Sequence, residues 1–204
     1  QRNNLISNED LKFIDWGSSA CEFIELIHDN YNLNCIAADY PSLAVDYANH
    51  LGYQSFQLDA NDAQSLPAQY HNYADIVTSL EQMEHITDLD SYFHIIHKAL
   101  TVDGCFLFST PNSSSLSQWI NYMYYGAPVD EGHHYRFLNR QKLNFLITLN
   151  GFDIVDEEHQ CRNHFGIQMA ELFVNTALNV TRPIAQSIAR TKEFRKGFKY
   201  KLDL

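Results

Sequence analysis

Three residues near the middle of the chain bring two carboxylates and an imidazole together. Glu81, Glu84 and His85 are spaced i, i+3 and i+4, so they lie on one face if the segment SLEQMEH is helical. Such a face is suited to a divalent cation, and its oxygen-rich ligands favour Mg²⁺ or Mn²⁺ over zinc. The other interpretation is a glutamate that caps the segment and a histidine that faces a substrate pocket.

Acidic residues also follow several apolar runs of strand length. Asp15 and Gly17 come at the end of the first run, Asp39 ends the second, and Asp62 lies in the loop NDAQSLP after the third. In a doubly wound sheet the ligand binds at the carboxyl ends of the strands, so these residues mark a candidate site. Carboxylates there favour a ligand with hydroxyls, an amine and a positive centre. The first loop has only one glycine of the GxGxxG pattern, which argues against a dehydrogenase.

The elements that must position these residues alternate between strand and helix, which is typical of parallel βαβ units. The predicted strands are 12–16, 34–39, 53–58, 73–79 and 104–110, with two more at 152–158 and 166–174. The predicted helices are 20–31, 42–51, 88–100, 113–125 and 139–151. Ser42 is the expected N-cap of the second helix, a turn at 101–104 ends the third, and Gly151 ends the last.

Five segments in this order resemble the class I S-adenosylmethionine-dependent methyltransferases, and among them the ubiquinone-biosynthesis O-methyltransferase branch. The resemblance runs from about Lys12 to Glu158 and includes the segments FIDWGSSACEF, AADYPSLAVDYA, NDAQSLP, YADIVTSLEQMEH with its continuation to STPN, and GHHYRFLNRQKL with its continuation to VDEE. It implies an α/β fold with a Rossmann-like doubly wound sheet that is mostly parallel and has an antiparallel last strand. It also implies S-adenosylmethionine as the cofactor.

The resemblance assigns cofactor contacts by position. Asp15, Gly17 and Ser19 would approach the methionine part, and Asp39 would accept hydrogen bonds from both ribose hydroxyls. The remaining contacts would be Tyr40 beside the adenine, Asp62 and Ala63 at its edge, and Leu80 in the pocket wall. The family usually has glycine where Ser19 and Cys21 stand, and a Cβ at position 21 crowds the start of the helix.

The resemblance also extends the histidine-containing site. Related enzymes, including methyltransferases of small-RNA 3′ ends, carry Glu-x-x-Glu-His with a downstream histidine, and here His133 or His134 would be the fourth metal ligand. His85 and His134 are the candidates for a catalytic base that deprotonates the methyl acceptor, since an imidazole titrates near neutral pH.

Charge divides the chain into two parts. Residues 1–180 hold seven basic and 23 acidic residues, a charge of −16, whereas residues 181–204 hold seven and two, a charge of +5. We expect a single methyltransferase domain at 1–180, with a substrate lid at about 111–137, and a basic C-terminal tail at 181–204. The acidic body argues against a nucleic-acid partner, because contacts to phosphate need a basic surface. The tail is either a solvated helix or a contact for an anionic surface or partner.

Cysteine spacing and the length of the apolar runs indicate where the protein works in the cell. The four cysteines are far apart and form no CxxC pair, as expected for reduced thiols. No apolar run is long enough to span a bilayer, so we expect a cytoplasmic protein without a transmembrane segment.

The sequence therefore predicts a methyltransferase that acts on oxygen of a small molecule. Two alternatives stay open. One is a methyltransferase for RNA 3′ ends or a surface sugar, and the other is a degenerate domain that binds without catalysis.

Overall fold

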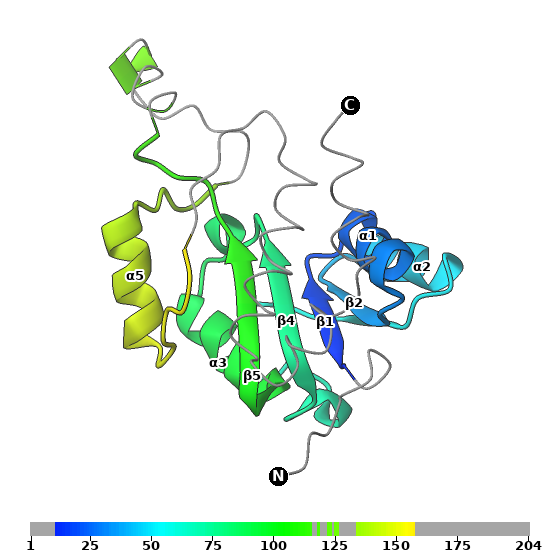
Figure 1. Ribbon diagram of the computed structural model, residues 1–204. Coiled ribbons are helices and arrows are strands. Elements are labelled where there is room, and N and C mark those ends of the chain that lie inside the picture. Colours follow the sequence, from blue (N-terminus) through cyan, green and yellow to red (C-terminus); the bar gives the residue numbers. More distant parts are fainter. Residues whose placement is uncertain (1–10, 116–117, 119–121, 124, 127–133, 158–204) are drawn as a thin grey trace.

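The computed structural model describes residues 11–115, 118, 122–123, 125–126 and 134–157, which build a parallel sheet covered by helices on both faces (Figure 1). The five described strands lie in the order β3-β2-β1-β4-β5, and every neighbouring pair is parallel. This is the predicted α/β, Rossmann-like arrangement. The elements in chain order are β1 (Phe13–Trp16), α1 (Glu22–Tyr31), β2 (Cys35–Asp39), α2 (Ser42–His50), β3 (Ser55–Gln57), η2 (Ala68–Tyr70), β4 (Ala74–Leu80), η3 (Met83–His85), α3 (Leu89–Ala99), β5 (Leu100–Ser109) and α5 (Arg140–Leu149).

The central strands are apolar because both faces of the sheet are covered. Side chains alternate along β1, so Phe13 and Ile14 enter different core clusters. The cluster on the Phe13 side contains Ile24 and Ile27 of α1, and the cluster on the Ile14 side contains the buried residues of α3. These two cores hold the strand ends in fixed positions.

The helices begin where local chemistry favours it. The side chain of Asp88 accepts hydrogen bonds from the backbone N–H groups of Asp90 and Ser91 and so caps α3. Asn139 caps α5 in the same way through the N–H of Lys142. By contrast, the predicted cap Ser42 is the first residue of α2 itself, and Pro41 holds the cap position without a side-chain bond.

The predicted turn at 101–104 lies within β5. The pairing with β4 jumps from Ala74 opposite Leu100 to Ile76 opposite Cys105, so residues 101–104 bulge out of the ladder. Gly104 permits this path, because an added Cβ would meet the Thr101 carbonyl oxygen and Leu100 Cδ2, both at 2.9 Å. The strand therefore starts directly after α3, and the turn is a bulge.

The end of the described chain differs from the prediction. Residues 152–157 form no strand after Gly151, whose φ is +80°. Instead, the ring of Phe152 stacks on His97 of α3, with ring centroids 4.1 Å apart, and this contact draws the segment toward the helix. The predicted strand at 166–174, and with it the antiparallel last strand, lies outside the described residues. The same holds for the basic tail and for residues 116–117, 119–121, 124 and 127–133 of the segment with the predicted helix at 113–125 and the predicted lid.

Among the residues that the structure describes, every helix is too short or too polar to span a lipid bilayer.

Candidate functional site

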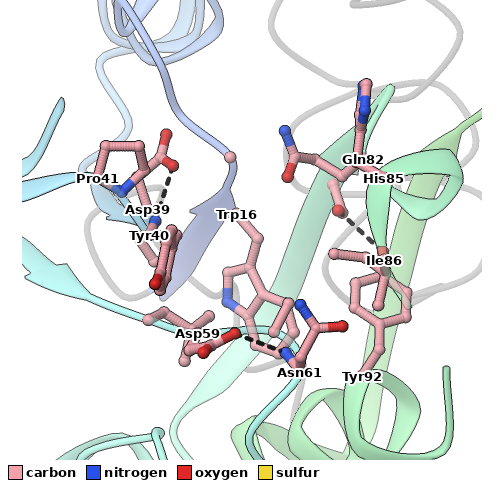
Figure 2. Close-up of a pocket in the computed structure, with 15 residues that line it drawn as sticks. Trp16, Asp39, Tyr40, Pro41, Asp59, Asn61, Gln82, His85, Ile86 and Tyr92 are labelled. Carbon is pink, nitrogen blue, oxygen red and sulfur yellow. Dashed lines mark hydrogen bonds between the residues drawn. The ribbon is translucent and has the colours of Figure 1, made fainter. Parts of the chain in front are cut away.

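A pocket of about 380 Å³ opens at the carboxyl ends of β1, β2 and β4 (Figure 2). This is the position expected for the ligand of a doubly wound sheet. Its walls come from the strand ends, the loop after β3, the η3 segment and α3. The lining residues are Trp16, Gly17, Ala38, Asp39, Tyr40, Pro41, Leu58, Asp59, Ala60, Asn61, Ser79, Gln82, His85, Ile86 and Tyr92.

The loop after β1 follows a path that normally requires glycine. Gly17, Ser19 and Cys21 have φ values of +75°, +46° and +62°. The N–H of Gly17 donates to the carbonyl of Ala38 at 2.8 Å, and the side chain of Gln82 lies where a Cβ on Gly17 would be. Ser19 and Cys21 do not line the pocket, and Cys21 is fully buried in the core beside α1.

Asp39 connects this loop to the pocket. One carboxylate oxygen accepts the N–H of Ser19 at 2.7 Å, and the other accepts the N–H of Tyr40 at 2.8 Å. A carboxylate has about four acceptor positions, so each oxygen can accept one more hydrogen bond. Asp39 lines the pocket and is only partly buried, so those positions are accessible to a ligand that carries hydroxyls.

Asp15 lies below the pocket and does not line it. Its carboxylate accepts a hydrogen bond from the Thr78 hydroxyl at 2.5 Å and is almost entirely buried. Burial, together with the nearby negative charge of Asp39, raises the pKa of Asp15 to about 7 although the Thr78 bond lowers it. The Asp15 carboxylate therefore links β1 to β4 through Thr78 in this geometry.

The other predicted cofactor residues fall into two groups. Gly17, Asp39 and Tyr40 line the pocket, whereas Asp62, Ala63 and Leu80 do not. In the loop after β3, the lining residues are the three just before Asp62, namely Asp59, Ala60 and Asn61. The Asn61 side chain accepts hydrogen bonds from the backbone of Thr87 and Asp88, which fixes this loop against the start of α3.

A second cluster adjoins the pocket and consists of Glu84, His85 and His134. One potential ligand atom from each lies within 4.8 Å of those of the other two. The rings of His85 and His134 meet edge to face with centroids 4.7 Å apart. Tyr135 positions His134, since its N–H donates to the Glu84 carbonyl at 2.8 Å.

The predicted metal ligands are thus only partly brought together. Glu81 is outside this cluster, because η3 covers only Met83–His85 and Glu81 has a φ of +52°. The single helical face predicted for Glu81, Glu84 and His85 therefore does not form. Its carboxylate accepts a hydrogen bond from the Ser109 hydroxyl at 2.6 Å instead. His133 lies outside the described residues. Burial raises the pKa values of both Glu81 and Glu84 above the ordinary glutamate value.

Eleven of the fifteen lining residues were not predicted from the sequence, and Trp16 and Gln82 are two of them. Trp16 stands between the predicted residues Asp15 and Gly17, and strand alternation alone would have turned it to the face opposite Asp15. Gln82 lies between the two glutamates of the acidic motif and covers Gly17. The signal for Trp16 was its place as the last residue of a strand, where a side chain meets the ligand edge of the sheet.

Two of three comparisons with known proteins match methyltransferases. A family model described as a methyltransferase domain matches residues 2–157. A comparison with curated proteins finds no match. Solved structures with the same fold include a SAM-dependent methyltransferase from Archaeoglobus fulgidus, with 17% identity, a TM-score of 0.57, and coverage of 85% of this chain and 80% of that one.

Two further solved structures share this fold. A putative methyltransferase in complex with the Trm112 activator of Haloferax volcanii has 14% identity and a TM-score of 0.61, with coverage of 90% of this chain and 79% of that one. Phosphoethanolamine N-methyltransferase 2 of Haemonchus contortus, in complex with S-adenosyl-L-methionine, has 15% identity and a TM-score of 0.57. The match covers 97% of this chain but only 46% of that protein.

Proposed function

The chain belongs to the methyltransferase domain family, and on that premise we propose that it methylates an oxygen atom of a small molecule with S-adenosylmethionine as the methyl donor. The observation that carries the proposal is that His85 belongs to two sites at once. It lines the pocket and also belongs to the cluster with Glu84 and His134.

The pocket residues fit the cofactor in chemistry and size. The volume of about 380 Å³ is within the range of small-molecule sites. Asp39 has two acceptor positions left for ribose hydroxyls, and Tyr40 offers an aromatic face for the adenine. When bound, S-adenosylmethionine supplies an activated methyl group, so the protein must mainly align the acceptor.

His85 and His134 would serve the acceptor. An imidazole beside the pocket can take the proton of a hydroxyl as the oxygen gains the methyl group, which is general-base catalysis. The buried carboxylate of Glu84 adjoins both rings and would stabilise the imidazolium that forms. The acidic body supports a neutral or cationic small molecule over an RNA 3′ end as the acceptor.

Calorimetric titration with S-adenosylhomocysteine tests the cofactor assignment. We expect Asp39→Asn to weaken binding about 10- to 100-fold, because hydrogen bonds to a charged acceptor are lost. Asp103→Asn, an exposed change in the β5 bulge at the opposite end of the sheet, should leave binding unchanged. Equal affinity in the wild type and Asp39→Asn would contradict the assignment.

As an alternative to this general-base role, we propose that the cluster of Glu84, His85 and His134 binds Mg²⁺ or Mn²⁺, in which case the imidazole lone pairs would hold the cation. Manganese binding, followed by electron paramagnetic resonance, should be lost in Glu84→Gln. Binding should strengthen as pH rises, because burial raises the pKa of Glu84 and the imidazoles must also be neutral to coordinate.

Glu81→Gln separates the two possible ligand sets. If the cation is held by Glu84, His85 and His134, this variant should keep the manganese signal, because the Glu81 carboxylate is engaged with Ser109. Loss of the signal in Glu81→Gln would support the four-residue set expected from the sequence. A wild-type protein that leaves manganese free in solution would rule out both.

A further inference from the structure

Trp16 forms part of the pocket floor at the end of β1. Figure 2 shows its indole between the side of the pocket with Tyr40 and Asp59 and the side with Ile86 and Tyr92. The side chain is only 2% exposed. Its ring meets Tyr92 edge to face, with centroids 6.0 Å apart, so the indole is held firmly from one side.

The indole nitrogen of Trp16 has no hydrogen-bond partner among the described residues, although it is buried. The neighbouring Tyr92 hydroxyl donates elsewhere, to Ser79 at 2.9 Å. A buried donor without a partner is costly, and a phenylalanine could fill much of the same space without that cost. Because Trp16 lines the pocket, a bound molecule is in position to supply the missing acceptor.

The groups around Trp16 indicate what kind of ligand atom would accept its hydrogen bond. Asp39 and Asp59 line the same pocket, and a carboxylate is suited to accept hydrogen bonds from the hydroxyl and amino groups of a ligand. The ring nitrogens of a purine are acceptors, so they need a donor from the protein. Tyr40 and Ile86 stand on opposite sides of the indole, which suits a planar ring between them.

We propose that Trp16 Nε1–H donates a hydrogen bond to a ring nitrogen of the cofactor's adenine and so makes the pocket specific for that purine. This inference rests on the assignment of the pocket to S-adenosylmethionine. A tryptophan here selects the ligand by hydrogen bonding as well as by shape, because a purine that lacks the nitrogen leaves the donor unpaired.

Calorimetry with deaza analogues tests the proposal. The 1-deaza, 3-deaza and 7-deaza forms of S-adenosylhomocysteine each replace one ring nitrogen by C–H. We expect the wild type to bind one of them about 3- to 10-fold more weakly than S-adenosylhomocysteine, the loss of one neutral hydrogen bond. In Trp16→Phe that preference should disappear, whereas in Asp39→Asn all ligands should weaken together and the preference should remain.

The outcomes separate this inference from the proposed function. If the wild type binds S-adenosylhomocysteine but shows no preference among the analogues, or if Trp16→Phe keeps the preference, the inference is overturned and the cofactor site stands. If the folded wild type binds none of these ligands, the cofactor assignment itself fails.

A fluorescence measurement gives a readout that does not depend on folding of Trp16→Phe. The chain has two tryptophans, Trp16 and Trp119, so Trp119→Phe leaves Trp16 as the sole emitter. Saturating S-adenosylhomocysteine should shift its emission. An unchanged spectrum at a ligand concentration that calorimetry shows to be saturating would contradict contact with the indole.

Discussion

Ser19 and Cys21 hold backbone angles that residues with a Cβ rarely adopt. Each such residue costs of the order of 1–3 kcal/mol and persists only where the surrounding structure imposes it. Here two hydrogen bonds hold the loop against the end of β2. The N–H of Gly17 donates to the Ala38 carbonyl, and the N–H of Ser19 donates to the Asp39 carboxylate. The loop path therefore survives the loss of two glycines, and Asp39 both shapes the loop and faces the pocket.

Asp15 predicts a specific pH dependence of stability. Its folded pKa of about 7 lies above the ordinary value of 3.8, so the folded protein holds this proton over a range where the unfolded chain has released it. The stability that the group contributes is complete below about pH 4 and is lost as pH rises to about 7. Asp15→Asn removes this titration and keeps an acceptor for Thr78.

Urea unfolding at a series of pH values measures the effect. Between pH 4 and pH 7 the free energy of unfolding of the wild type should fall by roughly 2–4 kcal/mol relative to Asp15→Asn. The difference between the two proteins isolates Asp15 from other buried carboxyls such as Glu84. Parallel pH profiles would show that folding does not raise the pKa of Asp15.

At the level of elements, the bulge in β5 sets the register of the sheet edge. Residues 101–104 leave the ladder after Leu100, and the pairing then continues regularly from Cys105 to Ser109. This register brings Ser109 beside Glu81, to which its hydroxyl donates at 2.6 Å. Thr110, the next residue, donates to Glu84 at 3.1 Å. A bulge at the amino end of the strand thus positions groups at its carboxyl end.

Gly104→Ala should destabilise the protein by about 1–3 kcal/mol, since the new Cβ would overlap the Thr101 carbonyl oxygen and the Leu100 side chain. Chemical denaturation measures the loss. Val102→Ala, in the same bulge but 96% exposed, should change stability by less than about 0.5 kcal/mol. If the two variants were equally stable, the bulge would have to be loose enough to relax around a side chain.

For the molecule as a whole, the pocket exists only in the folded chain. Its lining comes from segments as distant in sequence as Trp16, Asp59 and Tyr92. A ligand that binds only the folded state stabilises it, by about 2.7 kcal/mol at a concentration 100 times Kd. We expect this gain with S-adenosylhomocysteine, measured by denaturant unfolding with and without the ligand.

Asp39→Asn is the appropriate comparison for that measurement. At the same ligand concentration its stabilisation should be smaller, because the bound fraction of the folded state is lower. An equal gain in the wild type and the variant would mean that the ligand acts at another place on the molecule.

The order and type of most elements could be read from the sequence. Apolar runs and helical periodicity predicted all five described strands and four of the helices, because strands buried on both faces need continuous apolar residues. The same pattern indicated that Gly17, Asp39 and Tyr40 reach the ligand edge, since each follows a strand. The acidic motif also drew attention to Glu84 and His85, which the structure groups with His134.

Other features depended on three-dimensional contacts. The short η3 segment, rather than a full helix, separates Glu81 from Glu84, and hydrogen bonds from residues 135 and 136 to the Glu84–Thr87 backbone bring His134 to His85. Docking of Asn61 onto the start of α3 determines that residues 59–61 line the pocket in place of Asp62 and Ala63. Sequence spacing fixes which residues share an element. Which side chains meet across elements is decided by packing and long-range hydrogen bonds. The place of Trp16 at the end of a strand could be read from the sequence, but only the tertiary structure shows that its buried indole nitrogen lacks a partner beside a pocket.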